Sequence, residues 1–511
     1  MNGTMMKRYI ITCSMIWISV MCFCITLNVA TDGSGDFSNI QAALDAAQPG
    51  DSVLVYPGRY YENLIINTND ISLISLEAVT DSSVYIESTV IDGSLMNPCL
   101  RVSQRSTNVS IRGFSFTNGL SIGSGGGLLF SSGSSTSLTN SKVFGNIANT
   151  GGGINVIGAT VAFSGVEIFD NYSKLLGGGL LAVSITGYSH TITFDPLNRC
   201  SIYNNRSGVV QDILIRDANN NQIIYLDTFS VDNPTSYYAV FTTQHNEDYH
   251  MNIDFLNAHH QEINSDLYVS PDGDDANDGL SPTSPLRTIH EGIYRIAADS
   301  LSQKTVHLLP GTYSRTANNQ VFPIALKSWV KVQGSGMENT LVMGEPHPQI
   351  PIGNGSADTV FKTYIEPVVS IADLSITTQN TDNASAIDGA WKGSLSLSNI
   401  HIYGIAANFI AAIWMYMTSD YESTWDNVIV ENVTSTNSGL VDINGAMKGS
   451  ISNCRFRNAT STYTSSSVWA YPLVSIRGDE YMRFDNCEFS NLIMSDDDSH
   501  AIQVGGVQYP Q

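Results

Sequence analysis

The sequence has little charge, and most of that charge is negative. Only 14% of its 511 residues are charged, a composition typical of strand-rich repeats solvated by small polar side chains. Residues 27–265 carry 9 Lys+Arg and 21 Asp+Glu, a net charge of −12, and residues 266–511 carry 13 and 26, a net charge of −13. Neither half offers a basic face for nucleic acid or an anionic membrane, so neutral glycans or protein surfaces are the easier partners.

Cysteine is too scarce for a disulfide scaffold. Three of the 7 cysteines lie in the first 24 residues, and the others are Cys99, Cys200, Cys454 and Cys487, without the spacing of zinc ligands. Cys454 and Cys487 each follow an asparagine at an expected bend, so they should stack in adjacent turns of a repeat. A disulfide and a pair of reduced thiols both fit that stacking.

Long apolar runs are confined to the N-terminus. Lys7 and Arg8 precede an apolar run over residues 9–25, and small residues follow near Ala30. This pattern predicts a secretory signal peptide over residues 1–30, with a retained anchor as the alternative. We therefore expect a secreted or cell-surface protein with no membrane span once the signal is removed.

The rest of the chain contains one opening twice. Each copy has an Asp-Gly turn, a short amphipathic helix pattern, a strand and a Pro-Gly turn followed closely by tyrosine. Leu44 in the first helix corresponds to Ile293, 249 residues later, and Pro57 corresponds to Pro310, 253 residues later. The chain is therefore predicted to be a tandem duplication.

The duplication predicts two modules, over residues 31–256 and 266–511, joined by a linker over 257–265. Capping-box patterns from Ser38 to Gln41 and from Thr288 to Glu291 place a helix at the start of each module. Such a helix would cover the open end of a stacked sheet. Because the last residues, 500–511, show no terminal cap, we expect the second module to be truncated or to dock onto a partner.

After each opening the sequence becomes periodic. In the first half, glycine triplets begin at Gly125, Gly151 and Gly177, 26 residues apart. Between them lie Phe-x-Asn motifs, which begin at Phe116, Phe144 and Phe169, with a looser copy at Tyr203. A fixed period of short alternating strands with Gly and Asn punctuation predicts a solenoid.

In the second half, asparagine marks the period. Asn399, Asn427, Asn453 and Asn486 each separate two short alternating strands, and Asp373 holds the matching place 26 residues before the first. Asparagine tolerates the left-handed backbone of a bend, and stacked copies can bond side chain to side chain. Stacking coils about 4.8 Å apart would bury the apolar face of each strand. The predicted fold is therefore all-β, with tandem right-handed parallel β-helices that each open with a short capping helix.

These segments resemble known families. The stretch from Asp32 to Tyr60 is similar to the opening of pectin methylesterases and other pectin-lyase-like proteins, and residues 268–289 resemble the DUF1565 opening of secreted β-helix proteins. The glycine triplets and Phe-x-Asn motifs resemble those of bacterial surface adhesins. The resemblance implies a parallel β-helix and an extracellular location, and it leaves the activity open because this fold hosts lyases, hydrolases, esterases and adhesins.

Catalytic motifs of the resembled families are incomplete. Gln211-Asp212-Ile213-Leu214 resembles one pectin methylesterase motif, but the other motifs of that family do not follow. Asn380-Thr381-Asp382 resembles a short polygalacturonase motif, again without its companions. We therefore name no catalytic residue, and whether the protein is an enzyme stays open.

No cofactor is expected, with calcium as the alternative. The densest acidic loop contains Asp272, Asp274, Asp275, Asn277 and Asp278. Its spacing differs from that of an EF-hand, and its place at the module opening indicates a turn held by side-chain bonds to the backbone.

Two other segments with metal-binding residue types are expected to be structural. Residues 496–498, three aspartates, are expected to form a solvated loop. His259 and His260 lie in the expected linker and are given no ligand role.

Aromatic residues of the second half mark the expected binding region. They are Trp391, Trp414, Tyr416, Tyr421, Trp425, Trp469 and Tyr471. They could bind sugar faces or pack against the solenoid. The leading hypothesis is a secreted or cell-surface protein that binds an extracellular polysaccharide or a surface protein without catalysis. The alternative is a polysaccharide lyase or glycoside hydrolase, and the sequence does not indicate the oligomeric state.

Overall fold

The structure is a computed structural model of the full chain. It describes residues 24–217, 223–242, 252–350, 358–363, 368–379, 384–407, 411–417, 421–436, 439–445, 448–462, 473–476, 482–494 and 502–504. Within these residues the chain forms parallel β-solenoids with about 14 turns in all. The predicted all-β fold of tandem parallel β-helices, each opened by a short helix, is confirmed.

The first module stacks its strands into four parallel sheets. One sheet contains β1 (Thr26–Val29), β2 (Ser52–Val55), β5 (Ser72–Ser75), β8 (Val109–Arg112), β12 (Ser135–Thr139), β16 (Thr160–Ser164) and β20 (Thr191–Phe194). A second contains β3 (Gly58–Tyr61), β6 (Thr89–Asp92), β9 (Ser115–Thr117), β13 (Lys142–Phe144), β17 (Glu167–Phe169), β21 (Cys200–Tyr203), β24 (Ile224–Val231) and β26 (Ile253–His260). A third contains β4 (Leu64–Ile66), β7 (Leu100–Val102), β11 (Leu128–Phe130), β15 (Ile154–Ile157), β19 (Leu180–Val183), β23 (Ile213–Arg216) and β25 (Ala239–Thr242). The fourth contains β10 (Leu120–Ser124), β14 (Ile147–Thr150), β18 (Tyr172–Leu176) and β22 (Arg206–Ser207).

The second module repeats the stacking, and its longest strands lie in the middle of the module. Its strands are β27 (Leu267–Val269), β28 (Lys304–Leu308), β29 (Gly311–Tyr313), β30 (Ile324–Ala325), β31 (Val330–Gln333), β32 (Thr340–Gly344), β33 (Asp358–Thr363), β34 (Val368–Thr378), β35 (Ala384–Tyr403), β36 (Ala406–Ala407), β37 (Ile413–Met417), β38 (Glu422–Thr436), β39 (Val441–Gly445), β40 (Lys448–Ser452), β41 (Arg455–Thr462), β42 (Val474–Ile476), β43 (Met482–Asp485), β44 (Glu488–Met494) and β45 (Ile502–Val504). Inward side chains such as Ile371, Leu397 and Phe456 are buried. The alternating pattern thus fills one continuous core in each stack.

Both opening helices have side-chain caps. In α4 (Ile289–Arg295), the Thr288 side chain accepts a hydrogen bond from the Glu291 N–H, as predicted. In α1 (Ile40–Ala46), the cap is Asn39 and not Ser38, because the Asn39 side chain accepts from the N–H of Ala42 at 2.8 Å. The three shorter helices are α2 (Glu77–Thr80), α3 (Val84–Ser88) and α5 (Arg315–Asn318).

The duplication extends to individual hydrogen bonds. The hydroxyl of Tyr60 donates to the carbonyls of Val29 and Tyr56, and the hydroxyl of Tyr313 donates to the equivalent carbonyls of Val269 and Leu309. The hydroxyl of each tyrosine is therefore hydrogen-bonded to the first strand of its own module. The predicted tandem copy is confirmed at this level.

The glycine triplets stack as predicted. Each first glycine has a left-handed backbone, with φ of +67° at Gly125, +62° at Gly151 and +61° at Gly177. The second glycines need their lack of a side chain for a different reason. A Cβ on Gly152 would lie 2.4 Å from the carbonyl oxygen of Tyr172 and 2.6 Å from that of Gly178, so only glycine lets these backbones approach.

One of the Phe-x-Asn motifs is out of step with the others. Phe144 pairs with Phe169 and Phe169 with Tyr203, but Phe116 pairs with Val143. Since strand side chains alternate between faces, this shift of one residue turns Phe116 into the core, where it is fully buried. The motif therefore recurs once in each coil, but its phenylalanine does not occupy the same structural position in every coil.

Asparagines form the predicted ladder on the outside of the second module. Asn399, Asn427, Asn453 and Asn486 all have left-handed backbones with φ between +51° and +55°. The Asn427 amide donates to Asn399 at 3.0 Å, and that of Asn486 donates to Asn453 at 2.8 Å. Cys454 and Cys487, the next residues, are free thiols that donate to backbone carbonyls.

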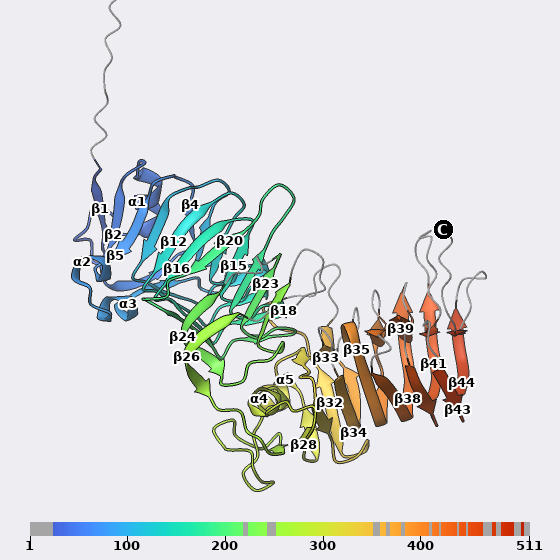
Figure 1. The fold of residues 1–511 in the computed structure, drawn as a ribbon. Helices are drawn as coiled ribbons and strands as arrows, with labels where there is room; N and C mark the ends of the chain where they lie inside the picture. Colours follow the sequence, from blue (N-terminus) through green and yellow to red (C-terminus); the bar gives the residue numbers. More distant parts are fainter. Residues whose placement is uncertain are drawn as a thin grey trace, which may run out of the picture.

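The two stacks meet at an angle, with α4 at the junction (Figure 1). The α4 residue Tyr294 donates its hydroxyl to Ser230 of the first module at 2.8 Å, and its carbonyl accepts from Tyr238. Helix α4 therefore covers the last coils of the first module as well as opening the second. Residues 257–260 of the expected linker belong to β26, which pairs with β24.

The expected signal segment falls mostly outside the described residues. Its last part, Thr26–Val29, forms β1 and pairs in parallel with Ser52–Val55 of β2. Within the described part of the chain, none of the helices has the length and apolar character needed to cross a membrane.

Candidate functional site

A stack of aromatic rings runs along the outer face of the sheet that contains β13, β17 and β21. Phe144 and Phe169 are stacked with centroids 5.1 Å apart and planes 8° apart, and Phe169 and Tyr203 with 5.4 Å and 11°. Tyr203 stacks in turn on His259, at 4.4 Å. These rings are half-buried or exposed, and their normals follow the solenoid axis because each ring faces the next coil.

The aromatic stack ends abruptly at Phe144. The register of β13 and β9 sets Thr117 opposite Phe144, and the next coil has Asp92 at the same position. The missing rings leave a groove of about 430 Å³, within the range of roughly 300–1,000 Å³ that holds ligands in proteins. The residues that line this groove are Arg59, Glu87, Val90, Ser115, Thr117, Asn118, Lys142, Phe144 and Phe169.

Helix α3 forms one side of the groove. The Ser115 hydroxyl donates to the carbonyl of Ile86 at 2.8 Å, and the ammonium of Lys142 lies 3.0 Å from the Glu87 carboxylate. On the opposite side, the Asn118 amide donates to Asp92 at 2.9 Å, in a turn where Asn118 has φ of +54°. The groove is therefore bounded across the strands as well as along the axis.

The charged groups of the groove are paired with one another. The guanidinium of Arg59 holds the Asp92 carboxylate through Nε at 2.7 Å. Burial opposes ionisation of Asp92, but hydrogen bonds from Ser94, Asn118 and Arg59 outweigh it and hold its pKa below the usual range. Burial likewise disfavours the charge of Lys142, but the carboxylates of Glu87 and Glu167 raise its pKa.

These shifts run against the needs of acid–base chemistry. A general acid carboxyl needs a raised pKa and a general base lysine needs a lowered one. Asp92 and Lys142 have the opposite shifts. The groove thus combines a free aromatic face with stably charged, mutually neutralised polar groups, an arrangement suited to holding a neutral ligand.

The acidic loop at the opening of the second module uses its side chains to hold the turn, as expected. Asp275 accepts hydrogen bonds from the N–H groups of Arg287 and Thr288, at 2.8 and 2.9 Å. Asp274 accepts from Ala276 and Asp278 from Leu280. Among the described residues, no group of three or more His, Cys, Asp or Glu is placed to hold a metal ion.

The residues that resembled an esterase motif are inaccessible. Gln211 and Asp212 are both fully buried, and burial raises the pKa of Asp212 to about 7. The Asp212 carboxylate accepts from Asn205, and Gln211 accepts from the N–H of Ser207. They are interior polar contacts and cannot touch a polymer. Asn380-Thr381-Asp382 and residues 496–498 lie outside the described residues.

The aromatic residues of the second half whose side chains the structure describes do not all lie on one surface. Trp425 is fully buried and donates its indole N–H to Leu395, so it is a core residue. Tyr421 is 40% exposed and packs edge-on against Trp329, at 5.6 Å, and Trp414 is half-buried on β37. Trp469, Tyr471 and the side chains of Trp391 and Tyr416 lie outside the described residues.

Sequence reasoning missed the groove although it used the residues beside it. The motifs at Phe144, Phe169 and Tyr203 carried the signal, since their rings recur every coil on the outer face. The hollow depends on a small residue, Thr117, at the position where a ring is missing. That absence is visible only once the register is known.

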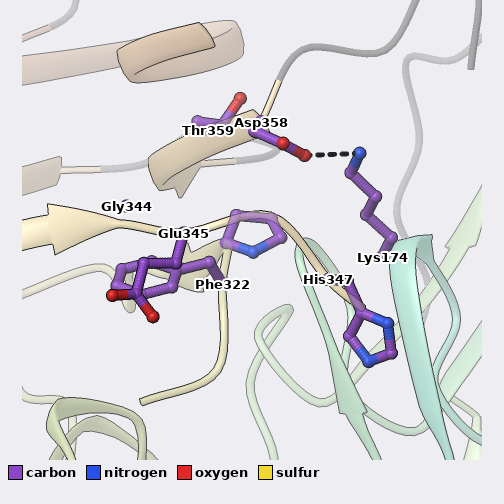
Figure 2. Close-up of a pocket in the computed structure, with 8 residues that line it drawn as sticks. Lys174, Phe322, Gly344, Glu345, His347, Asp358 and Thr359 are labelled. Carbon is purple, nitrogen blue, oxygen red and sulfur yellow. Dashed lines mark ion pairs between the residues drawn. The ribbon is translucent and has the colours of Figure 1, made fainter. Parts of the chain in front are cut away.

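A second, smaller pocket lies at the junction of the modules (Figure 2). Lys174 of β18 reaches across to Asp358 of β33 at 2.7 Å, and both side chains are nearly buried. Beside them, Tyr172 stacks on His347 at 5.1 Å and donates to the carbonyl of Phe322. The pocket volume is about 10 Å³, close to the least that holds one water molecule, so this site joins the modules and has no room for a larger guest.

One known family matches part of the chain. Residues 271–465 match a family described as "Protein of unknown function (DUF1565)". The second module matches DUF1565. The resemblance of residues 268–289 to the opening of that family is thereby confirmed, and the match covers the second module from its acidic loop through β41.

Solved structures similar to the chain are remote. One is a pectin methylesterase from carrot, with 9% identity, coverage of 78% of this chain and 82% of that one, and a TM-score of 0.22. Another is the PL6 family alginate lyase AlyGC, with 10% identity, coverage of 94% and 100%, and a TM-score of 0.24. At these scores neither supports an argument about function. No curated protein matches the chain.

Proposed function

We propose that the protein binds an extracellular polysaccharide in the groove of its first module, without catalysis. The observation that carries this proposal is the free face of Phe144, which looks onto a hollow rimmed by hydrogen-bonding side chains. A pyranose ring has apolar C–H faces and polar edges. It can therefore lie on an aromatic ring while its hydroxyls meet the rim, the same amphipathic match that favours aromatic residues at wet interfaces.

The electrostatics favour a neutral glycan. The two cations of the groove, Arg59 and Lys142, are paired with Asp92 and Glu87, which leaves no free positive charge for a uronate carboxylate. The protein as a whole has a formal net charge of −23, which would repel a polyanion at low salt.

A lyase or hydrolase is the alternative function. In its favour, the groove brings carboxylates and basic groups together from stacked coils, as an active site in this fold would. Against it stand the lowered pKa of Asp92 and the raised pKa of Lys142.

The N-terminal sequence pattern supports a location outside the cell. Because β1 begins at Thr26, we expect signal cleavage before Thr26, and not at Ala30, which N-terminal sequencing of the secreted form would check.

Binding and catalysis can be separated with one panel of neutral and acidic polysaccharides. The chain is incubated with each polymer, with and without calcium, and both retention and the release of reducing ends or unsaturated uronates are measured. We expect retention on a neutral polymer with no product. Product release from any polymer would overturn the non-catalytic proposal, and calcium dependence would then implicate a metal.

Substitutions then test the groove. Phe144→Ala removes the ring and should reduce retention at least tenfold, whereas Phe144→Tyr keeps it and should retain most binding. The matched control is Tyr268→Ala in the second module, where Tyr268 stacks on His307 at 5.0 Å. Equal loss in the control variant, or full retention by Phe144→Ala, would show that the groove is not the binding site.

A further inference from the structure

The groove is open to solvent above and is bounded by side chains in both directions of the solenoid surface. Along the axis it lies between Arg59 of β3 and the stacked rings of Phe144 on β13 and Phe169 on β17; β3 and β13 are three inter-strand steps apart, about 14 Å. Across the strands, the α3 residue Glu87 stands on one side and Asn118 on the other. An extended polymer running along the axis would therefore meet the stacked rings of Phe144 and Phe169.

Two positions in line with the aromatic stack carry no ring: Thr117, which lines the groove, and Asp92, which is buried and paired with Arg59. Thr117 and Asp92 stand in register with Phe144, and the next position in that column is Tyr61, which is 69% exposed. The ring normals of the stack follow the axis, since Phe144 and Phe169 are 8° from parallel. A guest ring laid on Phe144 must lie in the same orientation, above Thr117, with its plane across the solenoid.

We infer that the groove binds the end or a side branch of a neutral glycan, one or two sugar units, and not an internal stretch of the chain. A ring above Thr117 has Glu87 and Asn118 at its two edges, so the polymer can leave only toward solvent. This inference rests on the proposed function and adds to it the part of the polymer that is bound.

The side walls are held by contacts that a passing chain would have to break. On one side, Lys142 bridges from β13 to Glu87 at 3.0 Å and Ser115 holds α3 by a hydrogen bond of 2.8 Å. On the other, the turn of Asn118 is tied to Asp92 and accepts a backbone bond from Leu95 at 2.7 Å. The Asn118 turn and the backbone of α3 are thus held to the solenoid, while the Glu87 side chain itself is 70% exposed.

The test is a length series of neutral oligosaccharides, from one to six units, cut from the polymer that the full chain retains. We expect the molar affinity to reach its final value at one or two units and to change less than twofold from there to six. Trimming the polymer with an exo-acting glycosidase that changes its terminal unit should abolish retention. An affinity that keeps rising to five or six units would overturn the inference while leaving glycan binding in the groove intact.

A variant locates the guest ring. Thr117→Phe puts the protein's own ring in the vacant place next to Phe144 and should abolish binding of even the shortest oligosaccharide. The variant Ser137→Phe, on the outer face of β12 in a different sheet, is the control for adding an exposed ring. Unchanged binding by a folded Thr117→Phe variant would overturn the inference, and if that variant fails to fold, the length series decides alone. If no oligosaccharide or polymer binds at all, the proposed function itself fails.

Discussion

The two modules use asparagine ladders on opposite sides of the same architecture. In the first module, Asn146, Asn171 and Asn205 are at most 1% exposed and bond to one another inside the coil. In the second, the ladder that includes Asn453 lies on the outside, with its asparagines exposed or, at Asn427, half-buried. The inner ladder must satisfy every polar atom from its neighbours, whereas the outer one shares the task with water.

Comparison of the two modules shows which parts of a duplicated solenoid can change in sequence. Tyr60 and Tyr313 donate the same pair of hydrogen bonds to backbone carbonyls in the two modules. The packing of the opening coil is therefore the same in both copies. The outer faces have diverged. The first module carries aromatic rings and a groove, while the second places His401 and Arg457 on either side of Glu431, at 3.0 and 2.6 Å.

The largest effect is expected where the modules meet. Lys327, with 1% of its side chain exposed, pairs with the buried Glu262 and donates to the carbonyl of Ile296 at 2.7 Å. Lys327→Met should lower the free energy of unfolding by about 3–5 kcal/mol, because it leaves a buried carboxylate without its partner. Denaturant titration followed by tryptophan fluorescence would measure it.

The control for Lys327 is a lysine on an open surface. Lys448 lies 3.9 Å from Glu422, with side chains 36% and 60% exposed, so Lys448→Met should change stability by less than about 1 kcal/mol. If the two variants behaved alike, the junction would be held by apolar packing alone. If unfolding of Lys327→Met split into two transitions, the modules would have lost their coupling.

The next largest effect compares the two ladders directly. Asn171 donates to the carbonyl of Val143 and to Asn205, and accepts from Asn146. Asn171→Ala leaves several buried groups unpaired and should cost about 2–3 kcal/mol or more. Asn453→Ala, on the exposed ladder, should cost about 1 kcal/mol, because it removes two solvent-exposed hydrogen bonds, to Asp426 and from Asn486, at a left-handed backbone position. Thermal unfolding of both variants in one buffer gives the comparison. Equal losses of stability would mean that burial does not determine how much a ladder asparagine contributes to stability.

Much of the architecture followed from residues whose backbone geometry or packing allows few alternatives. Asn399 and Gly151 sit at left-handed bends, and Thr288 caps a helix; each of these was predictable because few residue types fit. The groove was not, because it depends on register. Phe116 and Phe144 look alike in sequence, and a shift of one residue sends the first into the core and the second to the surface. The junction contacts, such as Lys174 with Asp358, join residues too distant in sequence for any local pattern to relate.

A smaller effect tests the close stacking of the glycine triplets, which the second module lacks. A Cβ on Gly152 would lie 2.4 Å from a backbone oxygen, so Gly152→Ala must shift the neighbouring coil and should cost about 1–3 kcal/mol. Gly123→Ala is the matched control, since the nearest atom to its Cβ would be 3.8 Å away, and it should change stability by less than about 0.5 kcal/mol. A tolerated Gly152→Ala would show that the coils of the first module can separate locally.

The smallest net effect is a dependence of stability on pH, to which buried histidines near the junction contribute. Burial and then nearby positive charge lower the pKa of His347 to about 4, and burial with the neighbouring His259 does the same for His260. Both are therefore neutral in the folded protein, whereas in the unfolded chain they titrate near 6.5. Between about pH 6.5 and 4 the unfolded state binds more protons than the folded state, so stability should fall as the pH is lowered through that window.

Asp212 has the opposite effect. Its raised pKa of about 7 makes the folded state hold a proton that the unfolded chain loses near 3.8, so the stability that this group contributes falls as the pH rises. Midpoints of urea unfolding at pH 4.5 and 7.5 should show the balance. The Asp212→Asn variant should lose stability more steeply on acidification than the unmodified protein, and the double variant His260→Gln, His347→Gln should lose less. A double variant with the same acid sensitivity as the unmodified protein would place the acid-labile groups elsewhere in the chain.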